Sequence, residues 1–81
     1  MVFFCINSEK PLNFPGFIKV LSAETLLDSC GSDEELQELF EAGYTLQDLE
    51  NDTQYQVKCK DKQRLMDFCR QTPGIYDFWE V

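Results

Sequence analysis

Residues 54–81 read QYQVKCKDKQRLMDFCRQTPGIYDFWEV, and this stretch decides the fold because its hydrophobic period changes along the way. It opens with strict alternation of apolar and polar residues, which is typical of a half-buried strand with Tyr55, Val57 and Cys59 facing inward. Asp61 is then placed to cap a helix running to about Gln71. The apolar face of that helix consists of Leu65, Met66, Phe68 and Cys69.

The end of the same stretch predicts a turn and a second strand. Thr72-Pro73-Gly74 breaks the helix, and Ile75–Val81 follows as an apolar, aromatic strand. A right-handed strand–helix–strand crossover sets its two strands parallel, so we expect a mixed sheet. We also expect both faces of the last strand to touch apolar groups, because alternation places apolar side chains on each face. One face carries Ile75, Asp77, Trp79 and Val81, and the other carries Tyr76, Phe78 and Glu80.

The pattern V-x-C-x-D…RLMDFCRQTPGIYDFWEV in residues 57–81 resembles the second half of a ferredoxin-like or ACT-like domain. In those domains a helix after the third strand leads through a turn into a fourth strand. The resemblance rests on topology, and it implies a fold without implying a function. A middle region with two or three acidic helices departs from the six-element pattern of such domains.

The first third of the chain predicts strands joined by a loop. A β-branched and aromatic run is expected to form a buried strand, and a run rich in proline is expected to form a loop. Ser22 is expected to cap a helix that Gly31 ends. The expected elements are a strand at Val2–Ile6, a loop at Asn7–Gly16, a strand at Phe17–Leu21 and a helix at Ala23–Cys30.

The middle of the chain predicts two further helices. Ser32-x-x-Glu35 has the spacing of a capping box for a helix that Gly43 ends, and Thr45-x-x-Asp48 repeats it for a short helical turn. The apolar residues expected to hold this segment on the domain are Leu36, Leu39, Phe40, Leu46 and Leu49. The sequence therefore predicts a small α+β single domain over 1–81. Its sheet has three or four strands, with an acidic insertion of two or three helices.

The negative charge is concentrated in one segment. The chain has a formal net charge of −8, yet residues 22–52 hold ten acidic and no basic residues. Acids in a first helical turn, such as Asp33, complement the helix dipole, but those near a helix end do not, and no lysine is present to pair with them. We therefore predict a partner-binding surface made of Glu34, Glu35, Glu38, Glu41, Asp48, Glu50 and Asp52. A face that serves only for solvation remains the alternative.

The basic residues form only a small cluster, and we interpret it as a solvated strand edge that deters edge pairing. Binding of free nucleic acid is disfavoured, since phosphates must be neutralised by many cations. The residues of the cluster are Lys58, Lys60, Lys62 and Arg64.

The chain offers little for catalysis or metal binding. It has no histidine, no phosphate-binding glycine loop and no calcium-loop spacing. The cysteines Cys5, Cys30, Cys59 and Cys69 are widely spaced, and we expect reduced thiols used as small core residues, with a Cys5–Cys59 disulfide left open. No catalytic residue, metal or cofactor is predicted, and an enzyme is not expected.

The opening MVFFCIN has no basic region, and its apolar run ends at Asn7, too early for a signal peptide or a membrane span. We therefore expect a cytoplasmic protein with no membrane partner.

These observations lead to two functional hypotheses. The first is a non-catalytic, acidic regulator or inhibitor that presents residues 22–52 to a basic protein, for example a nucleic-acid-binding protein whose ligand the carboxylates mimic. Small phage-encoded inhibitors are similar in size and charge. The second is an ACT-like regulatory domain that forms a homodimer through its sheet and binds a small ligand. The terminal aromatics Tyr76, Phe78 and Trp79 are a candidate secondary interface.

Overall fold

Four strands form one antiparallel sheet in the computed structural model, which describes all residues from 1 to 81. The strands are β1 (Val2–Ser8), β2 (Ile18–Thr25), β3 (Thr53–Cys59) and β4 (Ile75–Glu80). Their order is β2-β3-β1-β4, and every neighbouring pair is antiparallel. The expected mixed sheet is therefore wrong. β3 and β4 do run in the same direction, but β1 lies between them and is antiparallel to both.

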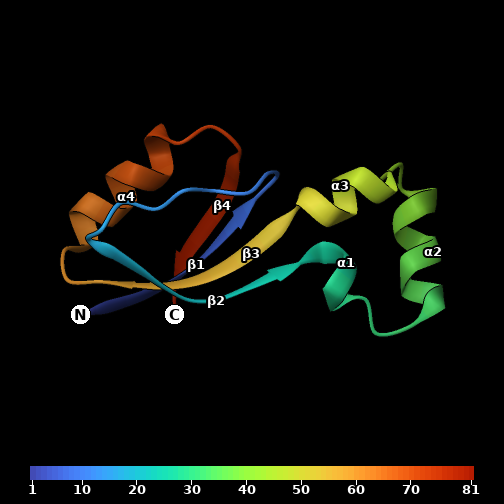
Figure 1. The fold of residues 1–81 in the computed structure, drawn as a ribbon, viewed down its shortest axis with the longest axis horizontal. Coiled ribbons are helices and arrows are strands. Elements are labelled where there is room, and N and C mark those ends of the chain that lie inside the picture. Colours follow the sequence, from blue (N-terminus) through green and yellow to red (C-terminus); the bar gives the residue numbers. More distant parts are fainter.

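Four helices accompany the sheet and lie in two places (Figure 1). One helix, α4 (Lys62–Gln71), covers a face of the sheet. The other three, α1 (Leu26–Ser29), α2 (Asp33–Glu41) and α3 (Leu46–Asn51), follow β2 and extend beyond the end of the sheet. They give the molecule its elongated extents of 40 × 22 × 17 Å. We call residues 26–52 the acidic arm, because they contain nine acidic residues and no basic one.

The core lies between α4 and the sheet. Its buried members come from β1, β2, β3 and α4: Phe4, Ile6, Ile18, Tyr55, Val57, Cys59, Leu65 and Cys69. Each large aliphatic side chain buried in this way contributes about 1.5–3 kcal/mol to folding. The alternation of β3 and the apolar face of α4 are thereby confirmed.

The segment 9–17 completes the cover of this face without forming a helix. It crosses from β1 to β2 on the α4 side of the sheet (Figure 1). The Phe14 ring packs edge-on against Tyr55 at 5.0 Å and lies 5.5 Å from Phe68. The Leu12 N–H donates to the Tyr55 hydroxyl at 3.0 Å. The loop is thus fixed by aromatic packing, and the prolines that prevent a helix do not leave the core open.

The helix expected at Ala23–Cys30 forms only over its second half, because its first three residues belong to β2, and Ser22 is not its cap. β2 continues to Thr25, with Ser22 opposite Gln56 and Thr25 opposite Thr53 in the ladder with β3. Only Leu26–Ser29 is helical, and Thr25 caps it by accepting the Asp28 N–H at 3.1 Å. The long β3 offers ladder hydrogen bonds to Ser22–Thr25, and these outweigh the helix propensity of Ala23 and Glu24.

A β-bulge changes the faces of the last strand. Asn7 pairs with Asp77 and Ser8 pairs with Ile75, which leaves Tyr76 without a partner in the ladder. Ile75 and Phe78 both pack on the core, so the expected grouping of Ile75 with Trp79 is wrong.

The four cysteines are free thiols, and three of them are buried. Cys5 lies opposite Gln56, whereas Cys59 lies opposite Val2 and belongs to the core cluster on the other face. A Cys5–Cys59 disulfide is therefore excluded by the register. Burial raises the pKa of the Cys69 thiol to about 11, which keeps it protonated at neutral pH.

None of the helices has both the length and the apolar character needed to cross a membrane.

Candidate functional site

The acidic arm leaves the sheet and returns to it at adjacent positions. Thr25 at the end of β2 pairs with Thr53 at the start of β3. The Leu26 N–H donates to the Asp52 carbonyl at 2.7 Å, which ties the first residue of the arm to its last. Leu49 of α3 is fully buried. The base of the arm is therefore firmly attached to the sheet.

The second helix has a well-defined beginning and end. Ser32 caps it by accepting the Glu35 N–H at 3.3 Å, as expected. The Glu35 carboxylate accepts from the Gly31 N–H at 2.8 Å, one residue before the position that a capping box requires. Gly43 ends the helix with φ +103°, and its N–H donates to the Phe40 carbonyl while the next N–H donates to that of Leu39, as in a Schellman motif.

The third helix begins with the predicted capping box. The Asp48 carboxylate accepts from both the N–H and the hydroxyl of Thr45, each at 2.8 Å, and the Asp48 N–H donates to the Thr45 hydroxyl at 3.2 Å. The backbone hydrogen bond, followed by the hydroxyl, holds the pKa of Asp48 below its ordinary value. Asp48 is thus occupied in part with holding α3.

The seven carboxylates of the predicted surface divide into two groups. Glu35, Asp48 and Asp52 accept hydrogen bonds within the chain. The other four are exposed and take part in none of the chain's hydrogen bonds or ion pairs: Glu34, Glu38, Glu41 and Glu50. This second group is free to bind a partner.

The apolar side of the arm is only partly covered. Of the five residues expected to hold the segment on the domain, only Leu49 is buried, while Leu36 and Leu39 are half-buried. Phe40 is 38% exposed and Leu46 is 53% exposed. Figure 1 shows why, since α2 lies at the outer end of the molecule, beyond α1 and α3 and away from the sheet. Apolar groups and free carboxylates are therefore both exposed on the arm.

An acidic cleft lies where the arm meets the start of β4. It encloses about 630 Å³ and is lined by Glu9, Ala42, Gly43, Tyr44, Asp48, Asp52 and Tyr76. Three of these residues are carboxylates and two are tyrosines, and no cation is among them. Such a lining suits an ammonium or guanidinium group, which carboxylates attract by charge and tyrosine rings attract by their faces.

One hydrogen bond joins the two sides of the acidic cleft. The Tyr76 hydroxyl donates to Asp52 Oδ1 at 2.8 Å. Burial, and then the hydrogen bond to Asp52 and its negative charge, raise the pKa of Tyr76 above its ordinary value. The β4 bulge at Tyr76 lets this side chain turn toward the arm.

The terminal aromatics lie in three different surroundings. Tyr76 lines the acidic cleft and is 54% exposed. Phe78 packs on the core, with its ring 6.5 Å from that of Phe4. Trp79 pairs with Cys5 on the sheet face away from α4 and is 41% exposed. The structure therefore joins Tyr76 to the acidic surface and separates it from Trp79.

Two members of the acidic cleft have no signal in the sequence. Glu9 follows β1 and is held there by its N–H, which donates to the Gly74 carbonyl at 2.8 Å. Tyr44 lies in the turn between α2 and α3. Their proximity depends on the pairing of β1 with β4 and on the direction of the arm, which no local pattern encodes.

No group of three or more histidine, cysteine, aspartate or glutamate side chains is arranged to hold a metal ion. Comparisons of the chain with protein-family models, with curated proteins and with solved structures found no match.

Proposed function

We propose that the protein is a non-catalytic regulator or inhibitor that binds a basic surface of another protein through its acidic arm and acidic cleft. The observation that carries the proposal is the acidic cleft, in which Glu9, Asp48 and Asp52 surround a concave space flanked by two tyrosines. A lysine or arginine side chain of the partner fills this space. The free carboxylates of α2 and α3 contact further cations around it.

Charge and apolar area have separate roles in this proposal. The arm has nine acidic residues without a basic one, which speeds association with a basic partner and makes the rate sensitive to salt. Phe40 and Leu46, both exposed, supply apolar contact that salt does not weaken. A partner that normally binds nucleic acid fits best, because the free carboxylates then stand in for phosphates. The cytoplasm is the proposed location.

The experiment is capture of partners from a cell lysate, with elution by increasing salt and identification by mass spectrometry. Glu38→Lys with Glu41→Lys changes the charge of α2 by four units, and we expect it to abolish capture of a basic partner. The matched control is Asp67→Lys with Asp77→Lys, which makes the same change outside the arm and is expected to retain capture. Equal loss in both variants, or retention in both, would contradict the proposal.

A second test addresses the acidic cleft with the partner so identified. Glu9→Gln and Asp52→Asn each remove one carboxylate charge from the lining. We expect each to weaken binding by about tenfold, as is typical when a charge-assisted hydrogen bond is lost. Asp67→Asn, which removes one charge from α4 outside the arm and the cleft, is the control.

The second candidate function is an ACT-like regulatory domain that dimerises through its sheet. Two observations favour it. Read from β4, the strand order is β4-β1-β3-β2, and the β3–α4–β4 unit admits β1 between its strands, as in a ferredoxin-like sheet. The sheet face away from α4 also exposes Phe3 and Trp79. Sedimentation of the wild type and of Trp79→Lys tests this function. The function requires that the wild type is a dimer and that the Trp79→Lys variant is a monomer.

A further inference from the structure

A basic pocket lies at the end of the sheet opposite the acidic arm. It encloses about 440 Å³ and is lined by Met1, Gly16, Phe17, Lys19, Lys58, Cys59, Lys60, Asp61 and Arg64. Small-molecule sites typically enclose about 300–1,000 Å³. Four of the chain's seven basic residues line this pocket, and they come from β2, β3, the turn after β3 and α4.

The interpretation of these cations as an edge that deters pairing is wrong for β3. β3 pairs with β1 on one side and with β2 on the other, so it has no free edge. Lys58 instead lies directly opposite Lys19 in the ladder. Side chains paired in this way have Cβ atoms about 4.5–5.5 Å apart, and like charges there destabilise the sheet. The pair needs another reason to be present.

The chain's own anions neutralise the pocket only in part. The chain has two ion pairs, Lys62 with Glu80 at 3.4 Å and Arg70 with Asp67 at 4.0 Å, and neither involves a lining cation. Asp61 is the one carboxylate in the lining. It accepts from the Gln63 and Arg64 N–H groups at 3.0 and 3.2 Å as the cap of α4.

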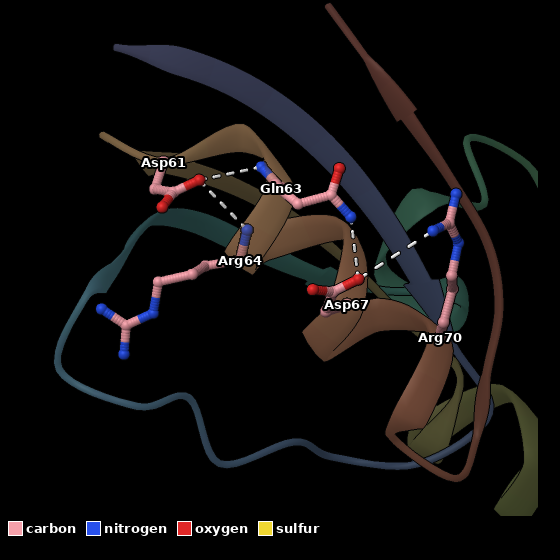
Figure 2. Close-up of polar contacts among 5 residues, drawn as sticks. All are labelled: Asp61, Gln63, Arg64, Asp67 and Arg70. Carbon is pink, nitrogen blue, oxygen red and sulfur yellow. Dashed lines mark hydrogen bonds and ion pairs between the residues drawn. The ribbon is translucent and has the colours of Figure 1, made fainter.

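The Arg64 side chain is held in place for binding. Figure 2 shows its guanidinium group pointing away from Asp61, with no hydrogen bond or ion pair drawn to it. Its Cζ atom lies 3.9 Å from the centroid of the Phe17 ring. This contact fixes the guanidinium without using its N–H donors, which remain available to bind two oxygens of a phosphate at once.

We propose that this basic pocket binds a small phosphorylated molecule. One phosphate lies between Lys19 and Lys58, on the sheet face away from α4, and relieves their repulsion, and Arg64 and Lys60 bind a second group at the end of the sheet. Met1 supplies an apolar wall for the rest of the molecule. The site is separate from the proposed protein-binding surface and does not depend on it.

The distance from the arm favours a small anion over a nucleic acid. The pocket lies at the Ile18 and Cys59 ends of β2 and β3, and the arm leaves from their Thr25 and Thr53 ends. β2 spans seven residue steps and β3 spans six, so at about 3.3 Å a step the two ends are about 20–23 Å apart. That exceeds two Debye lengths of about 8 Å at physiological salt, so the arm does not repel a small ligand. A long polyanion would extend toward the nine acidic residues of the arm.

The test is titration of the whole chain with pyrophosphate, inorganic phosphate, adenosine diphosphate and a single-stranded oligonucleotide at constant ionic strength. Binding is followed by calorimetry and by amide NMR shifts. We expect saturable binding of at least one of the three small phosphates. Its shifts should be confined to the start of β2, the end of β3 and the start of α4.

Variants inside and outside the basic pocket test whether the phosphate binds there. Lys19→Gln with Arg64→Gln is expected to weaken binding by about tenfold or more. Lys62→Gln with Arg70→Gln makes the same change of charge outside the pocket and is expected to keep the affinity. Without ligand, Lys19→Gln alone should raise the melting temperature, because it removes a like-charge pair. Glu38→Lys with Glu41→Lys, which tests the arm, should leave phosphate binding unchanged.

Three results would overturn the proposal. They are no saturation with any small phosphate, equal loss in the two lysine–arginine variants, and tighter binding of the oligonucleotide than of every small phosphate. None of them bears on partner capture by the arm.

Discussion

At the scale of single residues, the carboxylates of the arm divide by what they bind. Asp48 and Glu35 hold the starts of α3 and α2, whereas Glu38 and Glu41 make no bond in the chain. The sequence predicted this division in part, because a capping residue is recognised by its spacing from Ser or Thr. It did not predict the role of Asp52, whose partner Tyr76 lies 24 residues away in the chain.

The Tyr76–Asp52 hydrogen bond predicts that the free energy of unfolding falls as the pH rises through the alkaline range. The pKa of Tyr76 is raised in the folded state, so the bond contributes in full below the unfolded pKa of about 10 and is lost as the pH rises above it. We expect Tyr76→Phe to lower the free energy of unfolding by about 0.5–1.5 kcal/mol at neutral pH. We also expect it to reduce the loss of stability above pH 10, as measured by urea unfolding.

The control for this prediction is Tyr44→Phe. Tyr44 lines the same cleft but its hydroxyl donates no hydrogen bond in the structure, so its substitution should leave the free energy of unfolding at neutral pH nearly unchanged. The difference between the absorbance titrations of wild type and Tyr76→Phe gives the pH at which Tyr76 ionises. Ionisation of Tyr76 at the ordinary tyrosine pKa of about 10 would contradict the prediction.

At the scale of elements, local signals predicted where helices begin better than how far the strands extend and how they pair. Ser32, Thr45 and Asp61 cap helices as expected, since a cap depends on residues three or four positions apart. Ser22 does not, because β3, more than thirty residues further along the chain, provides its ladder partner. The bulge at Tyr76 was equally invisible, since it is defined only by the register against β1. Long-range pairing decided each of these errors.

The loose attachment of α2 predicts local unfolding of the arm. Gly43 adopts φ +103°, and an alanine there is strained by about 1–2 kcal/mol. α2 has no buried residue, so we expect Gly43→Ala to speed hydrogen exchange of α2 amides by about tenfold while β1 and β3 amides keep their rates. Gly16→Ala is the control, because that glycine has no positive φ and open space around its Cα.

The opposite outcome has a clear meaning. If Gly43→Ala also speeds exchange in β1 and β3, the arm and the sheet unfold together. The exposed Phe40 and Leu46 would then belong to a rigid extension of the sheet instead of a separately mobile arm.

At the scale of the whole molecule, charge separates two proposed sites. The acidic arm and cleft lie at one end of an elongated molecule, and four unpaired cations lie at the other. The sequence predicted the acidic end, because ten acids in one segment are visible in any count. It did not predict the basic pocket, because Lys19 is separated from Lys58 by the whole arm and only the ladder pairs them.

Because the arm carries one sign of charge, salt should affect its stability and its binding in opposite directions. On α2, Glu38 lies four residues after Glu34 and three before Glu41, and each such pair costs about 0.2–0.5 kcal/mol at low salt. Raising the salt from about 0.01 M to about 0.15 M shortens the Debye length from about 30 Å to about 8 Å. We therefore expect α2 amides to exchange more slowly as salt rises, while the captured partner dissociates faster.

Glu38→Gln removes both pairs and should flatten the salt response of exchange, whereas Asp77→Gln on β4 should not. Exchange that accelerates with salt in wild type would show that repulsion within the arm does not limit its stability, and the carboxylates would then carry no intrinsic cost for a partner to offset.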